Sequence, residues 1–270
     1  MSRPFPLKPA LTLPLLVGLA CLAVMIFGDR LSGYDHRAID LSARLVAPLS
    51  HGHLIGTDEL GRDVLARLLN GLRWSVGAAF CATLIAFCIG TSFGLVAAHR
   101  GAALGAALKL LTTFTQSFPS FVMAVTVIAL LGDSGFWAVT LTLGLVTWPV
   151  FSRVVYAEAR SLFQREYVQA AEMTGMSVMR LYARHVLPAL VPTLSVLVVF
   201  HFAEMIVAEG ALSFLGIGAP LGAATWGAML SEGRAFMLEA PWLTLGPAFA
   251  MVIIIVSAHS LGKQLRDAAR

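Results

Sequence analysis

The chain has 270 residues, of which 58% are hydrophobic and 13% are charged, and its formal net charge is +4. Soluble domains carry about 25% charged residues, so this composition excludes an ordinary soluble enzyme and indicates a protein surrounded by lipid. The basic balance requires no nucleic-acid partner, because an excess of Lys and Arg is the usual result of the positive-inside rule.

Six stretches contain no charged residue and are long enough to cross a bilayer as helices, which takes roughly 20 residues. Backbone polar groups in lipid must be hydrogen-bonded internally, so each stretch is predicted to be helical. The stretches are 9–28, 74–98, 110–132, 134–152, 185–203 and 240–262. The sequence therefore predicts an all-α membrane protein with six transmembrane helices.

The first apolar stretch, 9–28, follows Arg3 and Lys8 as the core of a secretory signal would. Its length exceeds the roughly 7–15 residues of a signal core, and no clear cleavage site follows it. We therefore expect residues 1–28 to form an N-terminal segment and a retained first transmembrane helix.

An even number of spans places both termini on the same side of the membrane. If that side is the cytoplasm, it holds 12 basic and four acidic residues, and the two short outer loops hold Arg234 as their one basic residue. Lys and Arg in short loops favour the cytoplasm. The expected arrangement is a multi-pass membrane protein with both termini cytoplasmic.

The outer segment, residues 29–73, has a helix-start signal near its end. Thr57 or Asp58 is a candidate N-cap, and an apolar stripe at helical spacing follows it. The stripe consists of Val64, Leu65, Leu68 and Leu69. This pattern predicts an amphipathic helix at the membrane interface. Asp58, Arg62 and Asp63 are close enough in sequence to form local ion pairs.

The cytoplasmic segment 160–187, within a permease core of residues 74–270, is too patterned for a simple connector. It predicts a short helix over about 165–173 that ends at Gly175, a residue suited to a left-handed helix end. A second helix from about Ser177 leads into the fifth span near Pro188. The small residues on this segment allow another protein to approach closely, although a plain surface loop is the alternative.

A third patterned stretch, residues 208–218 followed by 225–230, is apolar but interrupted by glycines and by Pro220. Irregular backbone at membrane depth is tolerated only where protein buries it or where it lines a cavity. The stretch is therefore predicted to be a re-entrant element beside a pathway.

In this order, the motifs resemble those of the second permease subunit of dipeptide/oligopeptide/nickel ABC importers. The resemblance covers about residues 34–268 and is strongest over 56–63, 166–188, 212–218 with 226–229, and 261–267. It implies the permease fold of type I ABC importers with a cytoplasmic coupling helix. Gln169 stands where the family usually has glutamate, Lys263 where an acid is common, and Thr113 where aspartate is frequent.

The resemblance further implies that the segment 165–187 docks in a groove on a cytoplasmic ATPase. The implied coupling residues are Arg165, Glu166, Tyr167, Gln169, Ala170, Ala171, Gly175 and Pro188. The implied partners are a second homologous permease, two ABC ATPase subunits that bind ATP and Mg²⁺, and an extracytoplasmic substrate-binding protein.

No catalytic residues, cofactor or metal site are expected in the chain itself. The sequence has no Gly-x-x-x-x-Gly-Lys-Ser/Thr loop to bind a nucleotide phosphate. The energy of ATP would therefore have to enter through another polypeptide, and the segment 165–187 is the candidate point of entry.

Candidate residues of a solute pathway are polar side chains inside the spans. Glu204 is a carboxylate within an apolar run, where a charge costs roughly 2.5–3.5 kcal/mol. Together with His201 and Met205 it is expected to form one helix face able to contact a metal chelate or a peptide's amino terminus. The alternative is a carboxylate paired with a partner permease. Met123 is a weaker candidate.

Two other classes of protein were considered. A self-sufficient secondary transporter typically shows internal repeats, and none is visible in this sequence. An intramembrane hydrolase requires a nucleophile facing a base, and the Gly-x-Ser-x-Gly elbow is missing. Within the favoured class, the substrate stays open between short peptides and nickel or metal–metallophore complexes.

Overall fold

The computed structural model describes residue 18 and residues 32–99, 102–132, 135–220 and 222–268. Within these residues the regular structure is helical, apart from two isolated β-bridges, Ser50–His53 and Thr57–Asp63. The predicted all-α fold is confirmed for this part of the chain. The predicted first span, 9–28, lies outside the described residues except for Gly18.

Four helical stretches are long and apolar enough to cross a membrane. They are α2 (Val64–His99), α5 (Phe136–Leu162), the stretch Val178–Phe214 that ends in α8 (Leu187–Phe214), and α10 (Trp242–Ala268). A fifth span exists if α3 (Ala102–Gln116) and α4 (Ser120–Leu131) are counted as one, although they meet at 81°. The count of six is therefore not reached within the described residues.

The predicted third span, 110–132, is formed by the end of α3 and by α4, with a bend between them. The chain leaves the helix after Gln116 and re-enters it at Ser120, directly after Pro119. Proline has no backbone N–H to donate and disfavours helical backbone in the residue before it. The bend therefore follows from Pro119.

The predicted amphipathic helix of the outer segment is not a separate element. The apolar stripe from Val64 belongs to the first turns of α2, which continues without a break to His99. The capping side chain is that of Asp63, because its Oδ1 accepts the backbone N–H of Ala66 at 2.7 Å. An acceptor placed directly before the first helical residue satisfies an otherwise unpaired N–H, and this fixes the start of α2.

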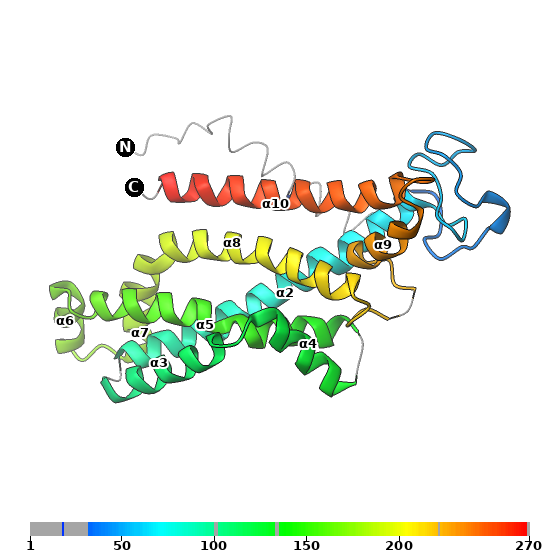
Figure 1. Cartoon of the computed structure of the whole chain (residues 1–270). Helices are drawn as coiled ribbons and strands as arrows, with labels where there is room; N and C mark the ends of the chain where they lie inside the picture. Colours follow the sequence, from blue (N-terminus) through cyan, green and yellow to red (C-terminus); the bar gives the residue numbers. More distant parts are fainter. Residues whose placement is uncertain (1–17, 19–31, 100–101, 133–134, 221, 269–270) are drawn as a thin grey trace, which may run out of the picture.

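Helices α2 and α5 pack closely through glycines. A Cβ at Gly90 would lie 2.5 Å from the carbonyl oxygen of Trp148, and one at Gly94 would lie 2.8 Å from that of Ser152. Residues four apart share a helix face, so the pair forms a flat strip that admits the neighbouring backbone. Helices α8 and α10 run side by side, and α2 crosses the bundle obliquely (Figure 1).

The two short helices predicted within the segment 160–187 are confirmed. Helix α6 (Glu166–Met173) ends before Gly175, whose φ of +77° lies in the left-handed region that favours glycine. Helix α7 (Val178–Leu181) is followed by a π-helical turn, η2 (Tyr182–Val186), that leads into α8. Helix α6 lies at the end of the bundle opposite to residues 32–63 and α9 (Trp226–Gly233) (Figure 1).

The glycine-rich stretch 208–218 is less irregular than predicted, since α8 continues through Gly210 to Phe214. A turn then reverses the chain, and α9 packs back on α8. A Cβ at Gly227 would lie 2.1 Å from the carbonyl oxygen of Gly210. These glycines allow two helices to touch and do not break α8. The short 3-10 turn η3 (Arg234–Phe236) leads on to α10.

Candidate functional site

The segment predicted to couple to an ATPase, residues 166–186 (α6, α7 and η2), lies at one end of the bundle and is called the coupling module (Figure 1). Val168 and Leu181 are buried in it. Of the predicted coupling residues, Ala171 is half-buried and the others are exposed. The exposed ones are Arg165, Glu166, Tyr167, Gln169, Ala170, Gly175 and Pro188.

Large apolar side chains on the coupling module are also exposed. Met173 is 89% exposed, Met179 78%, Tyr167 49% and Val178 47%. Methionine adapts its shape to irregular partners and is common at binding surfaces. Helix α6 is too short to span a bilayer, and α7 begins the stretch Val178–Phe214, whose 37 residues exceed the roughly 20 that a span needs. Lipid is therefore a poor explanation for this apolar surface. The surface has the character of a protein-docking site.

The predicted pathway face on α8 is divided by the fold. His201 and Met205 are each 2% exposed, whereas Glu204 is exposed. Consecutive helical residues are about 100° apart, so Glu204 and Met205 fall on opposite edges of the predicted face. The structure therefore brings His201 and Met205 into the core and turns Glu204 away from it.

The surroundings of the two buried residues are those of a packed core. His201 Nδ1 lies 3.2 Å from Thr83 Oγ1 on α2, and its ring centroid lies 4.9 Å from that of Phe151 on α5. Met205 Sδ lies 4.0 Å from Thr147 Oγ1 on α5. Met123, on α4, is half-buried.

A second carboxylate inside the bundle was missed. Glu209 on α8 is completely buried, and its Oε1 accepts a hydrogen bond of 2.7 Å from Ser213 Oγ. Ser75 of α2 also interacts with this carboxyl group. The predicted fifth span ended at residue 203, which assigned Glu209 to an irregular outer element. Glu209 and Ser213 are four residues apart, as are side chains that meet on one face of a helix. This spacing was the sign in the sequence that the fifth span continues beyond residue 203.

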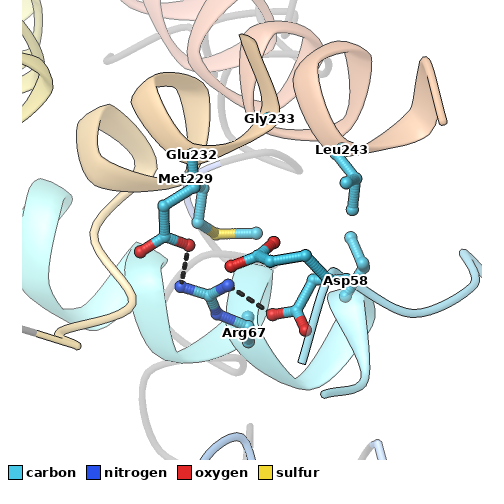
Figure 2. A pocket seen from close by; sticks show the side chains of 8 residues that line it. Asp58, Arg67, Met229, Glu232, Gly233 and Leu243 are labelled. Carbon is cyan, nitrogen blue, oxygen red and sulfur yellow. Dashed lines mark hydrogen bonds and ion pairs between the residues drawn. The ribbon is translucent and has the colours of Figure 1, made fainter. Parts of the chain in front are cut away.

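A network of charged side chains lies at the end of the bundle opposite α6 (Figure 1). Arg67 on α2 is 2% exposed, and its Nη1 donates to Asp58 Oδ2 at 2.5 Å. Its Nη2 forms an ion pair of 2.7 Å with Glu232 Oε2 on α9. Arg62 Nε donates to the same Asp58 oxygen at 2.7 Å. Figure 2 shows Arg67 between the two carboxylates. The predicted local pairing of Asp58 with Arg62 is confirmed.

Asp63 was expected to take part in the same local ion pairs. In the structure it pairs instead with His53, at 2.8 Å. The carboxylates of Asp58, Glu59 and Glu232 lie within 4.8 Å of one another, as in a cation site. Arg62 and Arg67 already contribute two positive charges to this cluster. The cluster is therefore an ion-pair network that joins the outer segment, α2 and α9.

Residues 90–270 match the family described as the binding-protein-dependent transport system inner membrane component. The chain belongs to this family. It is accordingly a multi-pass permease of an ABC importer in the inner membrane.

Curated relatives are permeases with different solutes in their names. The dipeptide transport system permease protein DppC of Alkalihalophilus pseudofirmus is 32% identical over 92% of this chain and 81% of its own length. The glutathione transport system permease protein GsiD of Pectobacterium atrosepticum is 31% identical over 93% and 83%. The nickel transport system permease protein NikC of Escherichia coli is 31% identical over 87% and 84%.

A solved structure of the MetNI methionine ABC transporter in an inward-facing conformation resembles the chain with a TM-score of 0.61. The likeness covers 76% of this chain and 96% of that chain at 17% sequence identity. It shows that the fold is that of an ABC importer permease, as the sequence predicted.

Proposed function

We propose that this permease forms half of a translocation pathway for short peptides and is driven by two cytoplasmic ATPase subunits that dock on the coupling module. The second half would come from a homologous permease, and a substrate-binding protein would deliver the solute from outside. ATP and Mg²⁺ would be bound by the ATPase subunits. The observation that carries the proposal is the exposed apolar surface of α6 and α7, at the end of the bundle opposite α9, in a family of ABC importer permeases.

In this proposal, nucleotide binding moves the coupling modules of the two permeases, and the bundles switch between inward and outward openings. Such switching is a rigid-body change between two packed states. The glycine contacts between α2 and α5 favour movement of these two helices as one body. Both termini are proposed to be cytoplasmic, since α10 ends at the same end of the bundle as α6 (Figure 1).

The choice between peptides and metal solutes rests on α8. A metal-binding face would use the nitrogen of His201 and the sulfur of Met205, both of which are buried in the core. Of the three residues of the predicted face, Glu204 is the exposed one. A single carboxylate can attract the cationic amino group of a peptide. Short peptides are therefore the favoured solutes, and nickel or a metal–metallophore complex is the alternative.

The test is transport by the complete complex in proteoliposomes, with its binding protein present and ATP on the side of the coupling module. Uptake of radiolabelled glycyl-leucine and of nickel ions is measured separately. The proposal expects ATP-dependent uptake of the peptide and none of nickel. Nickel uptake without peptide uptake would support the metal alternative, and uptake of a solute without ATP or ATPase subunits would indicate a secondary transporter.

A further inference from the structure

Three rings join the coupling module to the inner end of α2. The centroid of the His99 ring, in the last turn of α2, lies 5.0 Å from that of Phe163 and 5.6 Å from that of Tyr182. Phe163 and Tyr182 are themselves 6.0 Å apart. Phe163 ends α5 and Tyr182 begins η2, so the three rings come from three different elements.

Both ring contacts of His99 are edge-on, with interplanar angles of 69° and 79°. Edge-to-face packing is the favourable geometry for aromatic rings at these separations. The His99 side chain is 15% exposed, and its Nε2 lies 4.0 Å from Glu172 Oε1 on α6. His99 therefore contacts α5, α6 and η2 from a single position.

His99 lies at one end of α2, and the other end of this helix contacts α9. Helix α2 is continuous from Val64 to His99, and near its outer end Arg67 is ion-paired with Glu232 of α9. An unbroken helix moves as a rod, whereas the route from α7 to α8 passes through the π-helical turn η2. Single π-helical turns often occur at functional sites and interrupt regular helix geometry. The His99 contact is made with the first residue of that turn, Tyr182, and so bypasses the rest of it.

We propose that His99 is a positioning residue that transmits displacement of the coupling module to α2, and through α2 to the outer end of the permease. The inference rests on the proposed function, in which ATPase subunits move the coupling module. The ring contacts of His99 are expected to transmit this displacement more than its ion pair with Glu172 does. Glu172 is 54% exposed, and exposed ion pairs contribute little.

The experiment uses the complete complex in proteoliposomes and measures uptake of glycyl-leucine per ATP hydrolysed, together with subunit composition. With His99→Ala, we expect the complex to assemble and to hydrolyse ATP, while uptake per ATP falls at least about fivefold, the lower end of measured couplings between sites. His99→Leu, which keeps apolar volume but removes the ring, is expected to act in the same direction. His99→Phe is expected to retain most of the wild-type ratio.

His259→Ala is the matched control. His259 also contacts a phenylalanine, with its ring centroid 5.3 Å from that of Phe200, but it lies on α10 and Phe200 lies on α8, both outside the coupling module. This variant is expected to keep the wild-type ratio. An unchanged ratio in both His99→Ala and His99→Leu, with the complex intact, would overturn the inference. So would an equal loss of ratio in His259→Ala.

Failure of the proposed function and failure of the transmission role of His99 would give different experimental results. If the wild-type chain neither retains ATPase subunits nor transports solute with ATP, the proposed function itself fails. If the wild-type complex is coupled and His99→Leu loses hydrolysis and uptake in proportion, His99 is needed only for assembly and the transmission role is wrong.

Discussion

The guanidinium group of Arg67 lies between two carboxylates, with Nη1 2.5 Å from Asp58 and Nη2 2.7 Å from Glu232. Asp58 precedes α2 in the outer segment and Glu232 belongs to α9, so one buried side chain holds two distant parts of the chain. Arg67 and Asp58 are each 2% exposed. Charges this deeply buried are stable only while they are paired.

Replacing Arg67 should therefore destabilise the permease strongly. Arg67→Met leaves Asp58 with one fewer positive charge and should cost about 3–5 kcal/mol, the usual penalty for removing one partner of a buried ion pair. The measurement is the midpoint of unfolding in detergent, followed by tryptophan fluorescence. Arg37→Ala, at an exposed position of the outer segment, is the control and should shift the midpoint little. A midpoint for Arg67→Met equal to that of the control would contradict the account.

The turn between Asp58 and Asp63 should depend on Gly61. Its φ is +73°, and a Cβ there would lie 1.7 Å from the carbonyl oxygen of Asp40. Gly33 has a similar φ of +70° with nothing within 4 Å, so Gly33→Ala introduces backbone strain alone, about 1–2 kcal/mol. Gly61→Ala should lower the unfolding midpoint clearly more than Gly33→Ala does. Equal shifts would show that the close approach to Asp40 does not constrain the turn.

Much of the local structure could be predicted from the sequence, because its signals are local. The end of α6 at Gly175 required only a residue able to adopt positive φ at the right spacing. The start of α2 was misplaced because Thr57, Asp58 and Asp63 are all plausible caps. The choice of Asp63 depends on how the preceding turn folds, since Thr57 Oγ1 is occupied by Val46 N–H at 2.8 Å.

The candidate pathway was harder to predict because helix periodicity gives a face but not its direction. His201, Glu204 and Met205 are compatible with one broad face, and only packing against α2 and α5 decides which edge is buried. The charge network at Arg67 was likewise out of reach, because Glu232 lies in a distant part of the chain. Within the described residues, the pairs of this network with short sequence spacing are those of Arg62 with Asp58 and with Glu59, and the first of these was predicted.

Glu204 should affect transport without affecting assembly. Glu204→Gln keeps the size of the side chain and removes its charge, so a solute with a cationic amino group loses an attractive partner. We expect the KM for glycyl-leucine uptake to rise by about tenfold, which corresponds to roughly 1.4 kcal/mol. Subunit composition after purification should stay unchanged. Unchanged uptake would refute the pathway role, and loss of the second permease would instead place Glu204 at the subunit interface.

Glu209 should act mainly through its hydrogen bonds. It is fully buried, its Oε1 accepts from Ser213, and Ser75 also interacts with the carboxyl group. A buried carboxylate without a cation is costly, so Glu209→Gln should change the unfolding free energy by less than about 1 kcal/mol. Glu209→Ala should cost about 2 kcal/mol or more, since it leaves a cavity at the contact of α8 with α2. A large loss with Gln would indicate that the charged form is required.

The central claim is that the coupling module receives movement from a cytoplasmic ATPase, and site-specific crosslinking tests it most directly. A cysteine replacing Met179, 78% exposed on α7, should crosslink to an ATPase subunit in inside-out vesicles, with a yield that changes when ATP is added. A cysteine replacing Leu238, fully exposed between α9 and α10, should give no such product. Labelling of the residue-179 cysteine by an impermeant reagent from outside intact cells, or no crosslink in a complex that transports, would contradict the claim.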